Sequence, residues 1–378
     1  MRPSQPRVAL VHEWLTGGTD GSTRILQALT QMFPDAPVYV LAADGSSNSW
    51  LDRSRVRPSI VQPLAKAIGF RRSWLLPLLR QATENMRLGG FDLAISVSTA
   101  FAKNLDAKGA PHLCYCCSPM RFAWDHYPQY LDERSLRGPL RLAADRTIRR
   151  LREWDLAGTG RVTSFVAISE HVAARIERYY QRNAPIVYPP VPVHRFPIGA
   201  PPPPSSPYLC VSRLSAYKRI DLAVAACCAL GRTLTVVGVG AEAGRLRRMA
   251  CPLVSLVGRV EDRYLPHLYH SSRALLFPGE EDFGIVMVEA LAAGRPVIAF
   301  AKGGGGEIVQ DGRSGVTFDD QSVACLAGAI GRFESLEWAP ASLHERAKRF
   351  SVGRFVSDFA SQVGGLLPGY RIPPGQFN

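Results

Sequence analysis

Short apolar runs rich in β-branched residues recur along this chain, and segments with helical periodicity separate them. The runs in the first half are residues 7–12, 37–42, 92–98, 112–117 and 165–169. Those in the second half are residues 208–212, 233–238, 254–258, 274–278 and 296–300. Strands that are covered by helices on both faces are apolar throughout, and strands that alternate with helices pair in parallel. The sequence therefore predicts an α/β protein with two doubly wound parallel sheets.

A proline-rich stretch, residues 188–207, separates the two series of runs. Proline fixes φ and has no amide hydrogen, so this stretch suits neither a central strand nor a helix interior. A chain of 378 residues is long enough for two domains. We expect an N-terminal domain at 1–190, a linker at 191–207 and a C-terminal domain at 208–350. A helix and tail at 351–378 are expected to pack back on the N-terminal domain.

The positive charge of the chain is concentrated in its first half. Residues 1–195 hold 26 Lys and Arg against 16 Asp and Glu, and the remainder holds 19 against 16. Such an excess suits an anionic partner, whether a membrane surface, a phosphorylated lipid or nucleic acid. No apolar stretch is long enough to span a bilayer, and the N-terminal one is too short for a signal peptide, so we expect a cytoplasmic protein. The eight cysteines lack the paired C-x-x-C spacing of zinc sites, so we expect free thiols and no metal.

The densest chemical signal lies in residues 274–300, which predict a strand, a loop and a helix. Ligands of open α/β sheets bind beyond the carboxyl ends of strands, where this loop is expected. Glu281 and Glu289 are eight residues apart. On one helix, this spacing would put both carboxylates on one face about 12 Å apart. Alternatively, the acidic residues at 280–282 only complement the helix dipole.

Two further features suit an anionic ligand. The backbone amides of Phe283, Gly284 and Ile285 open the predicted helix, and helix N-termini bind anions. Arg213 and Lys218 follow the predicted strand 208–212 and precede a helix, where they could hold a diphosphate. The alternative for both cations is ordinary solvated surface charge.

Several motifs together resemble the donor domain of retaining glycosyltransferases of family four. These motifs are VSRLSAYKRID (211–221), VGRVEDRYLPHLY (257–269), FPGEEDFGIVMVEALAAGRPVIAF (277–300) and GGGGEIVQDGRSGVTF (303–318). Residues 12–41, 112–131 and 168–180 resemble the branch that contains bacterial O-antigen and exopolysaccharide mannosyltransferases. The resemblance implies the GT-B fold, in which two Rossmann-like domains face each other across a cleft.

The resemblance also implies roles for individual residues in binding a nucleoside-diphosphate sugar. Arg213 and Lys218 would hold the diphosphate, Glu281 the hydroxyls of the transferred sugar and Glu289 the ribose. The remaining donor contacts would come from backbone groups, at Arg259 and Val260 for the base, at Phe283, Gly284 and Ile285 for sugar and phosphate, and at Gly21 from the N-terminal domain.

The N-terminal half departs from its relatives at two positions. Cys117 stands where many relatives carry a histidine on the acceptor side, and a thiol with an ordinary pKa is mostly neutral at pH 7. Asp20 stands where relatives often carry a second glycine, which puts a negative charge near an expected phosphate wall. The acceptor-side candidates are Cys117, Arg121, Asp125 and His12.

The resemblance implies transfer with retention, in which the departing phosphate helps to take the proton of the acceptor. No D-x-D motif occurs, so cations and amides rather than a metal would hold the diphosphate. We expect GDP-mannose as donor and a saccharide or polyprenyl-linked saccharide as acceptor. Residues 66–81 interleave Lys and Arg with Phe, Trp and Leu, which suits docking on an anionic membrane surface.

Two other functions fit parts of the sequence. Gly238, Gly240 and Ala243 lie between a strand and a helix in the spacing of a dinucleotide site, which suits an NAD-dependent oxidoreductase. Residues 134–153 are strongly basic, which suits a nucleic-acid-binding protein. Neither alternative explains the two cations together with the Glu281 and Glu289 motif, so we expect no nicotinamide cofactor and no nucleic acid.

Overall fold

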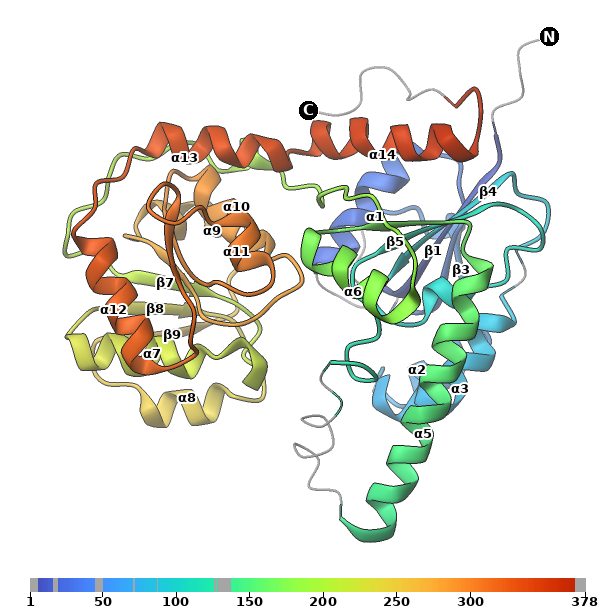
Figure 1. The fold of residues 1–378 in the computed structure, drawn as a ribbon, viewed down its shortest axis with the longest axis horizontal. Coiled ribbons are helices and arrows are strands. Elements are labelled where there is room, and N and C mark those ends of the chain that lie inside the picture. Colours follow the sequence, from blue (N-terminus) through green and yellow to red (C-terminus); the bar gives the residue numbers. More distant parts are fainter. Residues whose placement is uncertain are drawn as a thin grey trace. The chain divides into compact units, whose positions relative to one another are not determined.

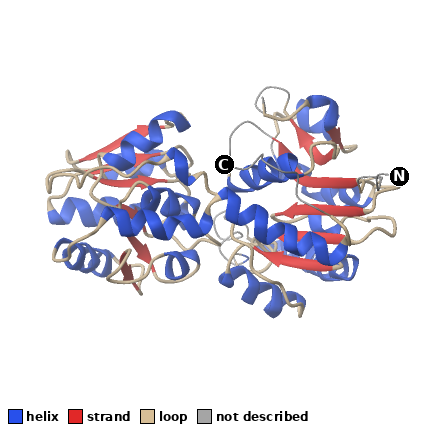
Figure 2. Ribbon diagram, turned by 90° about the horizontal axis from the view of Figure 1, so that it is seen from above, coloured by secondary structure: helices blue, strands red, loops and turns tan. Residues whose placement is uncertain are grey.

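The chain folds into two compact units, one formed by residues 1–190 and 355–378 and the other by residues 191–354. This arrangement comes from a computed structural model that describes residues 6–15, 20–44, 50–70, 72–86, 88–125, 127 and 137–370. Each unit contains one parallel sheet with helices on both of its faces (Figures 1 and 2). None of the described helices is long and apolar enough to cross a bilayer.

The first unit has a six-stranded parallel sheet in the order β3-β2-β1-β4-β5-β6. Its strands are β1 (Val8–Leu15), β2 (Val38–Ala43), β3 (Val56–Pro58), β4 (Leu93–Ser98), β5 (His112–Cys116) and β6 (Ser164–Ala167). Its helices are α1 (Gly21–Met32), α2 (Gln62–Ala67), α3 (Arg72–Glu84), α5 (Gly138–Ala157), α6 (Glu170–Tyr180) and most of α14 (Val352–Leu366).

The second unit repeats the arrangement in the order β12-β11-β10-β7-β8-β9. Its strands are β7 (Tyr208–Val211), β8 (Leu234–Val237), β9 (Val254–Gly258), β10 (Leu275–Phe277), β11 (Val297–Phe300) and β12 (Gly315–Phe318). Its helices are α7 (Ile220–Leu230), α8 (Ala243–Met249), α9 (Leu265–His270), α10 (Ile285–Ala292), α11 (Gly304–Ile308), α12 (Val323–Glu334) and α13 (Pro340–Ala347).

The core of the first unit has two layers. Ala9 and Val11 of β1 lie in one buried cluster with apolar residues of α2, α3 and α5. On β5, the ring of Tyr115 contacts Phe355 and Phe359 of α14, with ring centroids 5.8 Å apart in each case. The C-terminal helix thus supplies part of this core, although it is distant in sequence.

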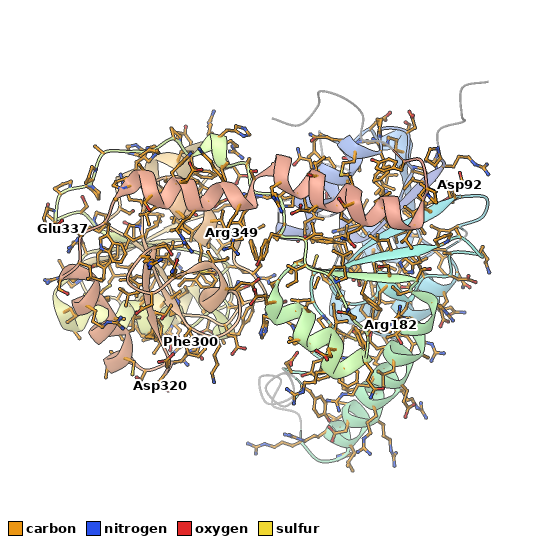
Figure 3. The ribbon with its side chains drawn as sticks, turned by 45° about the horizontal axis from the view of Figure 1, so that its top comes forward. Asp92, Arg182, Phe300, Asp320, Glu337 and Arg349 are labelled. Carbon is orange, nitrogen blue, oxygen red and sulfur yellow. A yellow bond between two sulfur atoms is a disulfide. The ribbon has the colours of Figure 1, made fainter. Side chains whose placement is uncertain are left out.

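In the second unit, the proline-rich residues pack against the sheet and its helices. The Val191 amide donates to the carbonyl of Phe350 at 2.9 Å, and the ring of Phe196 lies 5.6 Å from that of Tyr269. Phe300, labelled in Figure 3, ends β11 and contacts the ring of Phe318 on β12 at 5.7 Å. Residues 191–207 are therefore part of the second unit.

Three features differ from the sequence-based expectations. Strands β3 and β12 were not predicted, because their sequences, Val-Arg-Pro and Gly-Val-Thr-Phe, are not continuous apolar runs. Cys228 and Cys251 form a disulfide, so the expectation of free thiols is wrong for this pair. The two cysteines are 23 positions apart in sequence, and only the packing of α7 beside β9 brings them together.

We expect the second unit to lose stability in acid through Glu334. The hydrogen bonds from Arg232, at 2.8 Å to each carboxylate oxygen, and from Tyr208 lower the pKa of Glu334 to about 2 from an ordinary value of 4.5. A carboxyl with a lowered pKa in the folded state stabilises the protein above about pH 4.5, and this stabilisation disappears as the pH falls towards 2. The Glu334→Gln variant should therefore unfold at a lower temperature than the wild type at pH 7. The difference should shrink between pH 4.5 and 2, and a pH-independent difference in calorimetry would contradict this role.

Candidate functional site

A small pocket lies at the carboxyl ends of β7 and β10 in the second unit. Its lining includes Val211 at the end of β7, Ser212 after it, Lys218 before α7, and Pro278 and Gly279 after β10. From β7 the chain continues to β8 on one side and later returns to β10 on the other, so the strand order reverses between β7 and β10. Such a reversal is where open α/β sheets bind ligands.

Of the predicted site residues, Lys218 lines this pocket, Glu281 contacts Lys218, and Arg213 contacts Tyr217, the neighbour of Lys218 in sequence. The ammonium group of Lys218 contacts the carboxylate of Glu281, and the two side chains are only 16% and 15% exposed. The guanidinium of Arg213 donates to the hydroxyl of Tyr217 at 3.3 Å, and Lys218 lies over the Tyr217 ring at 5.1 Å. Tyr217 was not predicted, although its position between the two cations could have indicated it.

The loop between β10 and α10 corrects the expected geometry of the two glutamates. Helix α10 begins only at Ile285, after Gly284 with φ of 95° and ψ of 67°. Glu281 lies in the preceding loop, where it pairs with Gly303 and its carbonyl accepts from the Gly304 amide at 2.8 Å. The expectation that Glu281 and Glu289 share one helix face is therefore wrong, because the left-handed backbone at Gly284 turns the chain before the helix.

The predicted amide groups do open a helix. Phe283, Gly284 and Ile285 form the start of α10, and no side chain caps this end among the described residues. The start of α10 thus presents backbone donors close to Glu281. Phe283 itself is buried and its ring contacts Phe350 at 5.4 Å, which fixes the loop to the body of the unit.

The other predicted donor residues lie on α10 and after β9. Glu289, in the middle of α10, is 1% exposed and accepts a hydrogen bond from the Tyr269 hydroxyl at 2.8 Å. Arg259 and Val260 follow β9 at the edge of the sheet, with β8 between β9 and β7. Arg259 is exposed and Val260 is half-buried.

The glycines of the dinucleotide-like pattern have a packing role. A side chain at Gly240 would lie 2.1 Å from the carbonyl oxygen of Leu214, and one at Gly238 would lie 1.8 Å from that of Ser212. The loop after β8 is thus packed directly on the loop after β7. This contact accounts for both glycines without a bound dinucleotide.

In the first unit, Asp20 caps the helix that Gly21 begins. The Asp20 carboxylate accepts from the Thr23 amide and from the hydroxyls of Ser22 and Thr23, each at 2.8 Å. Burial raises the pKa of Asp20, but the charge of His12 and these hydrogen bonds outweigh burial and hold the pKa below its usual value. His12, buried on β1, contacts the Ser22 hydroxyl at 3.1 Å. The start of α1 therefore already holds a carboxylate of the chain itself.

A second carboxylate, that of Glu13, lies next to His12 on β1. Glu13 is buried and accepts from the amides of Thr99, Ala100 and Phe101 at 2.9, 2.6 and 2.7 Å. A carboxylate that accepts several amide hydrogen bonds is strongly held. Glu13 thus joins the end of β1 to the turn after β4.

Three of the four acceptor-side candidates lie on the segment after β5, and the fourth, His12, lies on β1. Cys117 is buried, and its amide donates to the Ser98 carbonyl at 2.8 Å. Asp125 forms an ion pair with Arg175 of α6 and accepts from the Tyr179 hydroxyl. Arg121 lies half-buried in the same segment. Asp125 is therefore tied to α6.

We expect that replacement of Gly284 by any residue with a side chain lowers the stability of the second unit. An added methyl group would lie 2.5 Å from the Met287 side chain and 2.9 Å from the Phe277 ring, at a φ of 95°. Gly284→Ala should destabilise the second unit by about 2 kcal/mol. The matched control is Gly328→Ala in α12, where the methyl group meets nothing within 4 Å and should stabilise by about 0.5 kcal/mol. Equal urea-unfolding midpoints for the two variants would refute this role of Gly284.

Known proteins that resemble this chain in sequence match mainly its second unit, which holds the Lys218 and Glu281 pair. Residues 207–335 match the family described as glycosyl transferases group 1. A glycogen synthase of Mycobacterium tuberculosis is 34% identical over 182 residues, which cover 45% of this chain and 43% of that protein. A GDP-mannose-dependent alpha-(1-6)-phosphatidylinositol monomannoside mannosyltransferase of the same species is 34% identical over 140 residues, covering 32% and 36%. Each match thus spans less than half of the relative's length.

Solved structures extend the likeness to both units. HepE of Anabaena in complex with UDP has a TM-score of 0.70 at 16% identity and covers 94% of this chain and 100% of its own. Sucrose-phosphate synthase of Thermosynechococcus elongatus has a TM-score of 0.72 at 17% identity, covering 96% and 100%. At such identities the likeness concerns the fold, and it confirms the predicted α/β fold with two Rossmann-like sheets. The chain therefore has the GT-B fold, and its residues 207–335 match the glycosyl transferases of group 1.

Proposed function

We propose that this protein is a glycosyltransferase that takes a hexose from a nucleoside-diphosphate sugar bound at the β7 and β10 strand ends. The observation that carries the proposal is the pairing of Lys218 with Glu281 at the point where the strand order reverses, beside the uncapped start of α10. A cation for the diphosphate and a carboxylate for sugar hydroxyls are thus next to each other. The match of residues 207–335 to glycosyl transferases of group 1 supports the same assignment.

The chemistry follows from these groups. The bond between the anomeric carbon and the phosphate oxygen breaks, and the acceptor oxygen forms its bond to the same face of that carbon. The departing phosphate takes the proton of the acceptor hydroxyl, so no protein nucleophile is required. Lys218, Arg213 and the amides at 283–285 would stabilise the negative charge that grows on the diphosphate. Glu281 would orient the sugar through its hydroxyls. The resemblance also assigns the ribose to Glu289, whose side chain is buried against Tyr269 in this structure.

The finer assignment is to family four and, within it, to the branch of O-antigen and exopolysaccharide mannosyltransferases. GDP-mannose is the donor we favour, which agrees with the GDP-mannose-dependent relative. UDP-sugars are the alternative, because HepE of Anabaena was solved with UDP and with UDP-glucose. We propose retention and a metal-independent reaction from the resemblance and from the lack of a D-x-D motif in the sequence.

A saccharide, free or linked to a polyprenyl diphosphate, is the proposed acceptor, in the synthesis of a bacterial surface polysaccharide. The protein would then work at the inner face of the cytoplasmic membrane, on an anionic lipid surface. Within residues 66–81, Leu75 and Leu79 are buried in the core of the first unit, so they do not serve as membrane contacts. Arg71 and the side chains of Arg72 and Trp74, also expected to contact lipid, lie outside the described residues.

Thermal unfolding with a panel of GDP, UDP, GDP-mannose, UDP-glucose and NAD tests the donor. A specific ligand at about 100 times its Kd stabilises the protein by about 2.7 kcal/mol, which raises the unfolding temperature. We expect the largest rise with GDP-mannose, followed by release of GDP and transfer of mannose when acceptor lipids are added. Stabilisation by NAD and by no nucleotide sugar would refute the proposal in favour of an oxidoreductase.

A further inference from the structure

Helix α5 stands out on the surface of the first unit. Its first turns extend beyond α2 and α3 (Figure 1), and residues 138–143 are all exposed. Leu140 and Leu142 are 67% and 62% exposed, more than any other leucine named among the large exposed apolar residues. Only the later part of the helix is held in the core, through Ile148, Leu151 and Trp154. The leading part of α5 thus carries apolar side chains in solvent.

The outward face of α5 is basic. Leu142, Arg146, Arg149 and Arg150 recur at i, i+4, i+7 and i+8, so they share one side of the helix. The buried residues Ile148, Leu151 and Trp154 lie on the opposite side. The three arginines are exposed, whereas Arg152 is turned inward over the Trp124 and Tyr127 rings. Leu142 thus precedes the three arginines along one exposed face, whereas Leu140 lies on the other side of the exposed first turns.

Helix α5 carries an excess of positive charge. Residues 137–153 hold six arginines against Asp145 and Glu153, a net charge of 6 minus 2, or +4. Arg137 occupies the N-cap position without a side-chain cap, and the first turn has no acidic residue. Positive charge at a helix N-terminus is unfavourable in isolation, because it lies at the positive end of the helix dipole. An external anionic surface would offset this repulsion.

We propose that residues 138–150 of α5 are the element that docks this protein on anionic lipid. The inference rests on the membrane association proposed above and assigns it to a surface other than residues 66–81. The exposed first turns, with Leu142 on the basic face and Leu140 on the opposite side, enter the boundary between headgroups and acyl chains, while Arg146, Arg149 and Arg150 contact lipid phosphates. Nucleic acid would satisfy the arginines, but it offers no apolar phase for the two exposed leucines.

Flotation of the full-length protein with vesicles tests this surface. The vesicles contain phosphatidylcholine alone or phosphatidylcholine mixed with phosphatidylglycerol. The wild type should float with the anionic vesicles only. Arg149→Gln/Arg150→Gln should reduce its partition coefficient about 30-fold, since each arginine near such a surface contributes about 5-fold. Leu140→Ser/Leu142→Ser should reduce it about 10-fold through the loss of apolar insertion.

The matched control is Arg247→Gln/Arg248→Gln, which removes two adjacent exposed arginines from α8 of the second unit. This control should float like the wild type. All variants should keep the thermal unfolding of the wild type and its shift with GDP or UDP, because the changed side chains are exposed and distant in sequence from Lys218 and Glu281.

Three results would overturn the proposal. Flotation of both α5 variants at the level of the wild type would place the docking surface elsewhere. Failure of the wild type to float, with the nucleotide shift intact, would refute membrane association but leave the sugar-transfer proposal standing. Retention on double-stranded DNA that depends on Arg149 and Arg150, without flotation, would make nucleic acid the partner of this helix.

Discussion

Arg213→Ala and Lys218→Ala are each expected to lower the turnover of the preferred nucleotide sugar by about 10²-fold or more. Both cations lie at the carboxyl end of β7, and Lys218 contacts Glu281 beside the start of α10. Removing one donor that stabilises a developing negative charge costs about 10² to 10³ in rate, because the charge grows only as the reaction proceeds. Most of the loss should therefore fall on kcat. Release of the nucleoside diphosphate measures it.

Arg219→Ala is the matched control for these variants. Arg219 belongs to the same turn, but its guanidinium lies 3.3 Å from the Asp221 carboxylate. This variant should keep most of the activity, whereas unchanged rates in both Arg213→Ala and Lys218→Ala would refute the assigned diphosphate site. The Lys218→Ala variant also frees the Glu281 carboxylate from its ion pair. Its folding must therefore be checked through the thermal unfolding of the second unit.

Asp155→Ala should destabilise the first unit by about 3 to 5 kcal/mol, the largest effect on stability that we expect. Lys103 and Asp155 are fully buried and 2.9 Å apart, and Asp155 also accepts from Trp124 at 2.9 Å and Tyr180 at 2.8 Å. Removal of one partner leaves a buried charge without compensation. Urea unfolding followed by tryptophan fluorescence reports on this unit, because five of the six tryptophans lie in residues 1–190.

Two further variants separate the buried charge from a simple cavity. Asp106→Ala breaks an exposed ion pair with Lys108 at 2.6 Å and should cost less than about 1 kcal/mol. Lys103→Met/Asp155→Leu removes both buried charges and should be more stable than Asp155→Ala alone. If the double variant is the less stable of the two, the polar contacts of Asp155 rather than the unpaired lysine account for the loss.

The contacts of Asp155 with Lys103, Trp124 and Tyr180 also show why the acceptor side was hard to predict. Trp124 and Asp125 follow β5, Asp155 ends α5, and Arg175 lies on α6. Asp125 and Arg175 are 50 positions apart in sequence, and no short motif links a tryptophan, an aspartate and an arginine at such distances. Asp125 forms an ion pair with Arg175, which lies far along the chain, because α6 packs beside the segment after β5.

The sequence by itself determined the alternation of strands and helices, the division into two sheets and the residues that gather at the β7 and β10 strand ends. These features are local, because apolar runs select strands and because the carboxyl ends of parallel strands share one edge of a sheet. Only the tertiary structure decided that Gly284 separates Glu281 from α10, that Asp20 caps α1, that Cys228 meets Cys251 and that the leading turns of α5 remain exposed. Each of these depends on a backbone angle or on contacts between segments distant in sequence, and a linear pattern of residue types contains neither.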